Sequence, residues 1–265
     1  MVLPWLFQLE VSNQCNSDCF ICPRKHLGLK PHTMTFEEIK PIIDSLKRNG
    51  HQLTQFHPYR MGEPLLCKDL ERITKYVQDN LGIWTYLFTN GSLLTEERIR
   101  SLLSVPIAQI AISVDGAGPD YEKLRKNLKW KTLVRNVNNL CKIRDEMGSK
   151  TLVIIRYSFL PETPGVENQL RAAFPIVYGI VGDKFDHWGE DRIPKLPCEF
   201  LSSHFTVDAN LNLLMCCKFS THSLGKINGD MDIMKFWQER TEPLRIETDY
   251  KRMPHDCLIC NKDKD

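Results

Sequence analysis

The chain has 265 residues, of which 42% are hydrophobic and 26% are charged. These proportions predict a sizeable packed core and exclude wholesale disorder. The formal net charge of +2 gives no electrostatic argument for binding nucleic acid or an anionic membrane surface.

The amino-terminal segment MVLPWLFQLEVS has neither the basic flank nor the small-residue cleavage site of a signal peptide. Its alternating residues 6–12 predict a first strand. Nowhere in the sequence does an apolar run approach the length needed to span a membrane. We therefore expect a cytoplasmic protein with neither a membrane nor a nucleic-acid partner.

Strand and helix patterns alternate along residues 1–183. Strands are expected at residues 6–12, 52–59, 83–91, 107–116, 150–159 and 174–183. Helices are expected at residues 35–50, 70–82, 95–105 and, with a break near Trp130, 120–147. Alternating βα units indicate a parallel sheet, and about six units are too few for a closed eight-stranded barrel. The predicted fold is therefore α/β, with a partial (β/α)6 barrel.

The alternation stops near residue 183. Two short strands, at residues 204–210 and 211–217, flank an Asp-Ala-Asn turn, and a helix at residues 229–240 follows them. A tail that carries two cysteines ends the chain. We therefore expect two domains, residues 1–183 and a small α+β domain at residues 184–265.

The ten cysteines are not expected to form structural disulfides, because the cytosol keeps thiols reduced. Eight of them fall in two groups: Cys15, Cys19 and Cys22, and then Cys198, Cys216, Cys217, Cys257 and Cys260. Grouping of this kind in a reducing compartment points to metal sites.

The first group reads Cys15-Asn-Ser-Asp-Cys19-Phe-Ile-Cys22-Pro. Three close thiolates can bind three irons of a cubane cluster and leave the fourth iron open to a substrate. The alternative is a zinc site completed by His26 or His32. Structural zinc sites usually carry paired C-x2-C knuckles, which this loop does not have.

The Cys-x3-Cys-x2-Cys spacing after a first strand, with an aromatic residue between the last two cysteines, resembles the signature of the radical S-adenosylmethionine (SAM) superfamily. The resemblance implies that the open iron of a [4Fe–4S] cluster binds the amino and carboxylate groups of SAM. It also implies that one electron cleaves SAM to methionine and a 5′-deoxyadenosyl radical.

Segments at the ends of later strands resemble SAM-contacting motifs of the same superfamily. The residues that the resemblance assigns to SAM are Gly62, Glu63, Pro64, Asn90, Ser113, Asp115 and Arg125. Met61 stands where the superfamily's Gly-Gly-Glu-Pro motif has its first glycine. The alternatives are ordinary turns for the first six and a solvated helix face for Arg125. Their common position at the carboxyl ends of parallel strands favours a binding site.

The second group resembles the twitch domain, a truncated form of the SPASM domain that follows the barrel of some radical SAM enzymes. A lone cysteine precedes a hairpin, another closes it, and a final pair follows a helix. The resemblance implies one auxiliary [4Fe–4S] cluster held by Cys198, Cys216, Cys257 and Cys260. Strand register favours Cys216 over Cys217, since adjacent strand residues face opposite sides. Zinc bound by four cysteines is the alternative.

The superfamily resemblance implies an oxidoreductase that abstracts hydrogen from a small, carbohydrate-like or aminocyclitol substrate. The auxiliary cluster would accept an electron, and an external donor such as flavodoxin or ferredoxin would supply the reducing electron. Candidate acid–base residues are Arg156, Tyr157, His187 and Glu190, with His57, Tyr59 and Arg192 beside them. The alternatives are a maturase that modifies a ribosomal peptide, a redox-neutral epimerase, and a two-site metal or electron-transfer protein.

Overall fold

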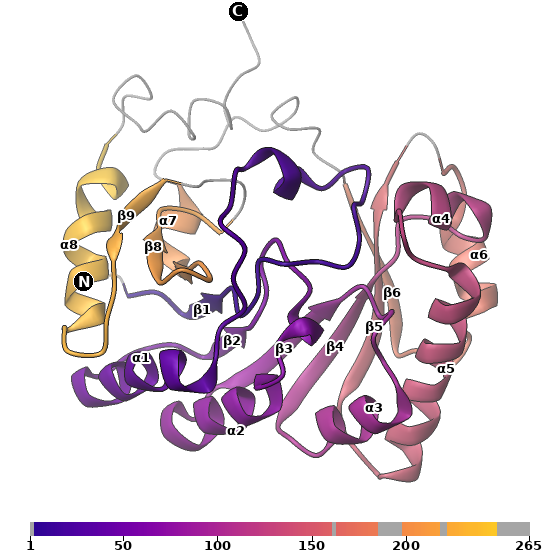
Figure 1. The fold of residues 1–265 in the computed structure, drawn as a ribbon, viewed down its shortest axis with the longest axis horizontal. Helices are drawn as coiled ribbons and strands as arrows, with labels where there is room; N and C mark the ends of the chain where they lie inside the picture. The colour runs from indigo at the N-terminus through magenta and orange to yellow at the C-terminus, as the bar shows by residue number, and fades with distance from the viewer. Residues whose placement is uncertain (1–2, 161–162, 185–197, 218–221, 248–265) are drawn as a thin grey trace, which may run out of the picture.

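The computed structural model describes residues 3–160, 163–184, 198–217 and 222–247. Its strands are β1 Leu6–Leu9, β2 Gln55–His57, β3 Trp84–Thr89, β4 Ile107–Ser113, β5 Leu152–Phe159, β6 Gly179–Lys184, β7 His204–Val207, β8 Asn212–Leu214 and β9 Ser223–Lys226. They form one sheet in the order β6-β5-β4-β3-β2-β1-β7-β8-β9 (Figure 1). Pairing is parallel from β6 through β1 to β7, and antiparallel between β7, β8 and β9. The predicted parallel α/β sheet is thus confirmed.

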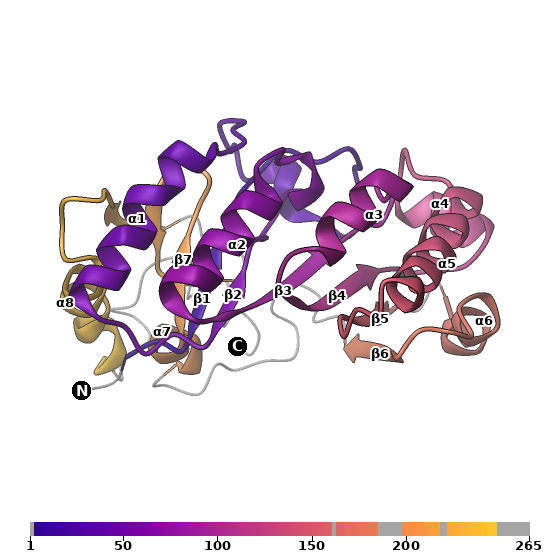
Figure 2. The ribbon, with the colours of Figure 1, turned by 90° about the horizontal axis from the view of Figure 1, so that it is seen from below.

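The helices are α1 Phe36–Asn49, α2 Leu70–Leu81, α3 Glu96–Leu103, α4 Pro119–Leu124, α5 Trp130–Glu146, α6 Val166–Ala173, α7 Glu199–Ser203 and α8 Ile233–Arg245, with 3-10 turns η1 Pro23–His26 and η2 Pro64–Leu66. Figure 2 shows α1, α2, α3 and α5 side by side across one face of the sheet. No helix of the described residues is long and apolar enough to cross a membrane.

Helix α1 shows how the sequence directs the local structure. Thr35 and Glu38 form a capping box, in which the Thr35 hydroxyl accepts from the Glu38 N–H and the Glu38 carboxylate accepts from the Thr35 N–H. Ile39, Ile43 and Leu46 recur at helical spacing and are fully buried. The polar cap therefore sets where the helix begins, and the apolar stripe sets which face packs on the sheet.

One predicted helix break is confirmed, whereas helices α6 and α7 and strand β9 were not predicted. The predicted break in the helix at residues 120–147 is present, since α4 and α5 are separated by a segment in which Asn127 has a φ of 72°. Helix α6 was not predicted, because within its eight residues only Val166 and Leu170 are buried. Two apolar positions four residues apart give too weak a helical period to detect.

The carboxyl-terminal hairpin continues the main sheet. Strand β7 pairs in parallel with β1, and the Phe7 ring lies 5.3 Å from that of Phe56 and 5.2 Å from that of Phe205. The core beneath β2, β1 and β7 is therefore continuous. The division into residues 1–183 and 184–265 stays a prediction, because residues 185–197 lie outside the described part of the chain.

We expect Thr35→Ala to lower the free energy of unfolding by about 1 kcal/mol, because the Glu38 N–H loses its capping acceptor. Urea unfolding followed by circular dichroism measures this. Lys131→Ala, at an exposed position of α5, should change the same quantity by less than about 0.5 kcal/mol. Equal losses in both variants would contradict a specific role of the cap.

Candidate functional site

The loop that carries the first three cysteines lies at the carboxyl ends of the parallel strands. It follows β1 and arches over the sheet as the indigo segment of Figure 1. Cys19 is buried, Cys15 and Cys22 are half-buried, and within the described residues none of the three forms a disulfide. We call residues 12–34 the cysteine loop.

Gly62 allows the backbone after β2 to lie very close to the backbone of the cysteine loop. A Cβ atom at this position would lie 2.0 Å from the Ser12 carbonyl oxygen and 2.6 Å from that of Gln14. The next residue, Glu63, donates its N–H to the Gln14 carbonyl oxygen at 2.8 Å. Only glycine allows this backbone contact, so the structure gives Gly62 a packing role.

Glu63 joins the ends of β2 and β3 through its buried carboxylate. Oε1 accepts from the Leu65 N–H at 3.1 Å and from the Thr89 hydroxyl at 2.6 Å. Oε2 accepts from the Asn90 N–H at 2.8 Å. Burial raises the pKa of Glu63, and these hydrogen bonds oppose the rise. Pro64, also buried, begins the turn η2 directly after it.

Asn90 connects the end of β3 to the cysteine loop. Its Nδ2 donates to Asn16 Oδ1 at 2.8 Å, and Asn16 Nδ2 donates to Ser92 Oγ at 2.8 Å. Ser92 completes the ring by donating its N–H and its hydroxyl to Asn90 Oδ1. Asn16 and Ser92 were not among the residues predicted from the sequence. The sequence signal that could have identified them is their position close to Cys15 and Asn90, which were already predicted to belong to the site.

Arg125 links β4 to the second cysteine. Its Nη2 lies 2.6 Å from Asp115 Oδ2, and its Nη1 donates to Cys19 Sγ at 3.7 Å. Asp115 Oδ1 accepts from the Ser158 N–H at 3.0 Å. Burial lowers the pKa of Arg125, but Asp115 and Cys19 outweigh it, so the pKa lies above its ordinary value. The interpretation of Arg125 as part of a solvated helix face is therefore wrong.

Two polar atoms beside this ion pair are buried with no hydrogen-bond partner among the described residues: Arg125 Nε and the Tyr121 hydroxyl. Burial raises the pKa of Tyr121 above its ordinary value. Buried polar atoms without partners are rare in folded proteins and mark places where a ligand or water binds. Ser113, the last residue of β4, is half-buried and lies opposite Arg156 in the sheet register.

The three thiols fit an iron–sulfur cluster better than a zinc ion. His32 Nε2 lies 2.9 Å from Glu38 Oε1 at the start of α1, so this ring nitrogen already has a partner. Across the described residues, no three His, Cys, Asp or Glu side chains are close enough to hold one metal ion. A cubane spaces its thiolates more widely than a single ion does, because each thiolate bonds a different iron.

Burial raises the pKa of Cys15 to about 11 and also raises that of Cys22. Both thiols are therefore protonated at neutral pH in the metal-free protein, and metal binding must release their protons.

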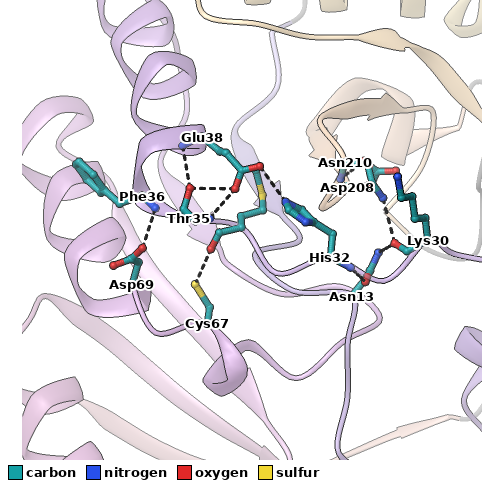
Figure 3. A network of polar contacts seen from close by, with 11 residues as sticks. Asn13, Lys30, His32, Thr35, Phe36, Glu38, Cys67, Asp69, Asp208 and Asn210 are labelled. Carbon is teal, nitrogen blue, oxygen red and sulfur yellow. Dashed lines mark hydrogen bonds and ion pairs between the residues drawn. The ribbon is translucent and has the colours of Figure 1, made fainter.

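The return segment of the cysteine loop is tied to the beginning of the same loop and to the turn between β7 and β8 (Figure 3). Asn13 Nδ2 donates to the Lys30 carbonyl oxygen at 2.8 Å, and Asn13 Oδ1 accepts from the His32 N–H at 2.7 Å. Asn210, in the turn between β7 and β8, donates to the same Lys30 oxygen at 3.4 Å. The carboxyl-terminal hairpin thus contacts the loop directly.

A pocket of about 500 Å³ lies on the face of the sheet opposite the main helices. Its lining residues are Leu6, Gln8, Gln55, His57, Tyr59, Tyr86, Phe88, Gln109, Arg156, Phe200, His204 and Cys217. His57 Nδ1 accepts from the Tyr59 hydroxyl at 2.9 Å, and Nε2 donates to Gln55 Oε1 at 3.1 Å. Burial lowers the pKa of His57 to about 3, so the ring is neutral.

Of the candidate acid–base residues, the structure brings His57, Tyr59 and Arg156 to this pocket. Tyr157, the next residue along β5, faces the other side of the sheet and donates its hydroxyl to Glu167 Oε2 at 2.7 Å. Alternation along the strand therefore removes Tyr157 from the pocket. His187, Glu190 and Arg192 lie outside the described residues.

The later cysteines are placed only in part. Cys198 precedes α7 and packs against Leu201 and Met215. Strand β8 ends at Leu214, so Cys216 and Cys217 lie beyond it and not within the predicted strand. The preference for Cys216 over Cys217 stays a prediction. Cys217 lines the pocket described above. The remaining two predicted ligands, Cys257 and Cys260, lie outside the described residues.

A second hollow, of about 530 Å³, lies at the opposite ends of β3, β4 and β5. Its lining includes Trp84, Pro106, Lys150 and Leu152 and contains no cysteine, histidine or carboxylate. None of its lining residues belongs to the cysteine loop.

The sequence matches a protein-family model and resembles several characterised proteins over part of its length. The model of the Radical SAM superfamily matches residues 9–162. The S-adenosyl-L-methionine-dependent 2-deoxy-scyllo-inosamine dehydrogenase of Niallia circulans is 32% identical over 117 residues, which cover 41% of this chain and 44% of that protein. The PqqA peptide cyclase of Bradyrhizobium diazoefficiens is 30% identical over 115 residues, covering 43% and 29%. The matched segment thus spans less than half of either relative.

Solved structures share the fold over nearly the whole chain. BtrN in complex with AdoMet and 2-DOIA matches with a TM-score of 0.61 at 18% identity, covering 92% of this chain and 86% of that one. The structure of anSMEcpe with bound AdoMet matches with a TM-score of 0.67 at 15% identity, covering 96% and 88%.

We expect Gly62→Ala to lower the thermal unfolding midpoint by at least about 4 °C, because the added Cβ overlaps the Ser12 carbonyl. Gly179→Ala is the matched control, since its Cβ would meet nothing closer than 3.9 Å. Differential scanning calorimetry measures both. A Gly62→Ala midpoint as high as that of Gly179→Ala would contradict the close approach.

Proposed function

Because the chain belongs to the radical SAM superfamily of enzymes, we propose that Cys15, Cys19 and Cys22 hold its [4Fe–4S] cluster and that SAM binds at the adjoining strand ends. When bound, the cluster supplies the electron that cleaves SAM and starts radical chemistry on a substrate. The observation that carries this proposal is the attachment of the cysteine loop to the ends of β2, β3 and β4. Gly62, Asn90 and Arg125 each contact it.

The chain's own residues around SAM have separate tasks in this proposal. Glu63 and Asn90 use their hydrogen bonds to hold the strand ends and the loop in one arrangement. The Tyr121 hydroxyl and Arg125 Nε are two buried donors beside the cysteine loop that have no hydrogen-bond partner in the described structure, so both are available to a ligand. SAM offers acceptors for both, in its carboxylate and its ribose hydroxyls.

We further propose that the enzyme is an oxidoreductase that dehydrogenates a small polar molecule in the pocket of about 500 Å³. Gln8, Gln55 and Gln109 line the pocket with amides suited to hydroxyl groups, and the neutral His57 adds no charge. The likeness to a 2-deoxy-scyllo-inosamine dehydrogenase and to BtrN with 2-DOIA supports a small substrate.

In a dehydrogenation, loss of a hydrogen atom and a proton from the substrate leaves one electron to be removed. The proposed acceptor is an auxiliary [4Fe–4S] cluster in a twitch domain at residues 184–265. Its ligands are Cys198, Cys257, Cys260 and one of Cys216 and Cys217. An external donor such as flavodoxin or ferredoxin supplies the electron that cleaves SAM.

Peptide modification is the second candidate function. It is favoured by the similarity to PqqA peptide cyclase and by the shared fold with anSMEcpe bound to the Cp18Cys peptide. Mass spectrometry of the products separates the two candidates. The first predicts a small-molecule product that is 2 Da lighter than its substrate, whereas the second predicts that a peptide substrate changes in mass.

We expect Cys15→Ala, Cys19→Ala and Cys22→Ala each to abolish SAM cleavage, because three protein thiolates are needed to hold an open-iron cluster. The measurement is 5′-deoxyadenosine formed by anaerobic, dithionite-reduced protein. Cys141→Ala, at a buried cysteine of α5, is the control and should retain cleavage. Undiminished cleavage in any of the three loop variants would overturn the cluster assignment.

Removing two proposed ligands of the auxiliary cluster should separate SAM cleavage from product formation. We expect a Cys257→Ala/Cys260→Ala double variant to fall from about eight irons per chain to about four and still to form 5′-deoxyadenosine. It should give no oxidised product from 2-deoxy-scyllo-inosamine, provided that the wild type oxidises this compound.

Circular dichroism must accompany the iron count, because loss of a cluster can unfold a small domain. Four irons and one zinc per wild-type chain would contradict the auxiliary cluster but would remain consistent with the proposed cluster at Cys15, Cys19 and Cys22. A folded double variant with native product formation would contradict the electron-acceptor role.

A further inference from the structure

Arg125 places a buried positive charge against one cluster thiol. Its Nη1 donates to Cys19 Sγ, whereas Cys15 and Cys22 have no arginine hydrogen bond among the described contacts. The Arg125 side chain is 13% exposed and that of Asp115 is 3% exposed. Solvent therefore screens this charge weakly.

The geometry also fixes the guanidinium in place. Asp115 holds Nη2 at 2.6 Å, and the Ser158 N–H holds the other oxygen of Asp115 at 3.0 Å. The carboxylate thus anchors Arg125 to β5 while Nη1 faces the sulfur. Arg24, within the cysteine loop, pairs with Asp18 at 2.8 Å, and this pair is more exposed to solvent than that of Arg125 and Asp115.

We propose that Arg125 is a positioning residue that raises the reduction potential of the cluster at Cys15, Cys19 and Cys22 by donating to Cys19 Sγ, with Asp115 holding it there and offsetting its charge. One-electron reduction adds a negative charge to the cluster, and a cation hydrogen-bonded to a ligand sulfur stabilises that added charge. The inference rests on the proposed function, since it takes Cys19 to be a cluster ligand.

The test is a redox titration of the reconstituted protein under anaerobic conditions, with dithionite as reductant and the signal of the reduced cluster followed by electron paramagnetic resonance. Arg125→Met should shift the reduction equilibrium at least about tenfold toward the oxidised cluster, which is about 59 mV for one electron. Arg125→Lys keeps the charge and a donor, so it should retain most of the wild-type potential. Asp115→Asn removes the offsetting charge and should shift the potential the other way.

Arg98→Met is the matched control, because Arg98 pairs with Glu71 at 3.1 Å and has a similar exposure of 21%. Its guanidinium donates to the Cys67 carbonyl oxygen and not to a cluster thiol. If Arg125→Met fails to fold, the Arg125→Met/Asp115→Asn double variant leaves no unpaired buried charge. It should still shift the potential downward, because the donor to Cys19 Sγ is lost, but by less, because the loss of the Asp115 charge opposes the loss of the Arg125 charge.

A wild-type potential in the Arg125→Met variant or the double variant would overturn this inference alone. Equal downward shifts in Arg125→Met and Arg98→Met would also overturn it, since they would indicate a general loss of structure. Absence of any cluster signal in the wild type would overturn the proposed function as well.

Discussion

The Glu63 carboxylate is enclosed by protein, and an enclosed carboxylate is tolerated only when donors replace the water it has lost. Those donors are the Leu65 and Asn90 N–H groups and the Thr89 hydroxyl, so the end of β2 and the end of β3 are held in one position. The same turn presents Gly62 to the backbone of the cysteine loop. The arrangement of the loop thus depends on how the hydrogen-bonding groups of one buried carboxyl are satisfied.

A second buried carboxylate, Asp115, does for β4 and β5 what Glu63 does for β2 and β3. It differs in having a full positive charge, Arg125, as its partner. The two carboxylates give the site opposite kinds of support. The hydrogen-bond donors to Glu63 are neutral groups, whereas beside Asp115 the guanidinium brings a positive charge to the sulfur of Cys19.

Much of this end of the molecule follows from the sequence. Alternating strands and helices predict the parallel sheet, and parallel strands bring Glu63, Asn90 and Asp115 to one edge. The pairing of Arg125 with Asp115 was beyond sequence reasoning, because the lysines around Arg125 suggest a solvated surface and only the path after α4 turns this side chain inward. The end of β8 was misjudged for a similar reason, since its length depends on pairing with β9.

Strand β1 lies between β2 and β7, and these two neighbours come from distant parts of the chain. During synthesis β2 emerges soon after β1, whereas the other edge of β1 stays open until residue 207 has left the ribosome. Contacts of such long sequence separation form late in folding and slow it. The cysteine loop continues directly from β1, and the turn at Asn210 touches it. The nascent chain therefore completes the surroundings of its first three cysteines only after most of the polypeptide has been made, and the proposed cluster would be enclosed no earlier than this.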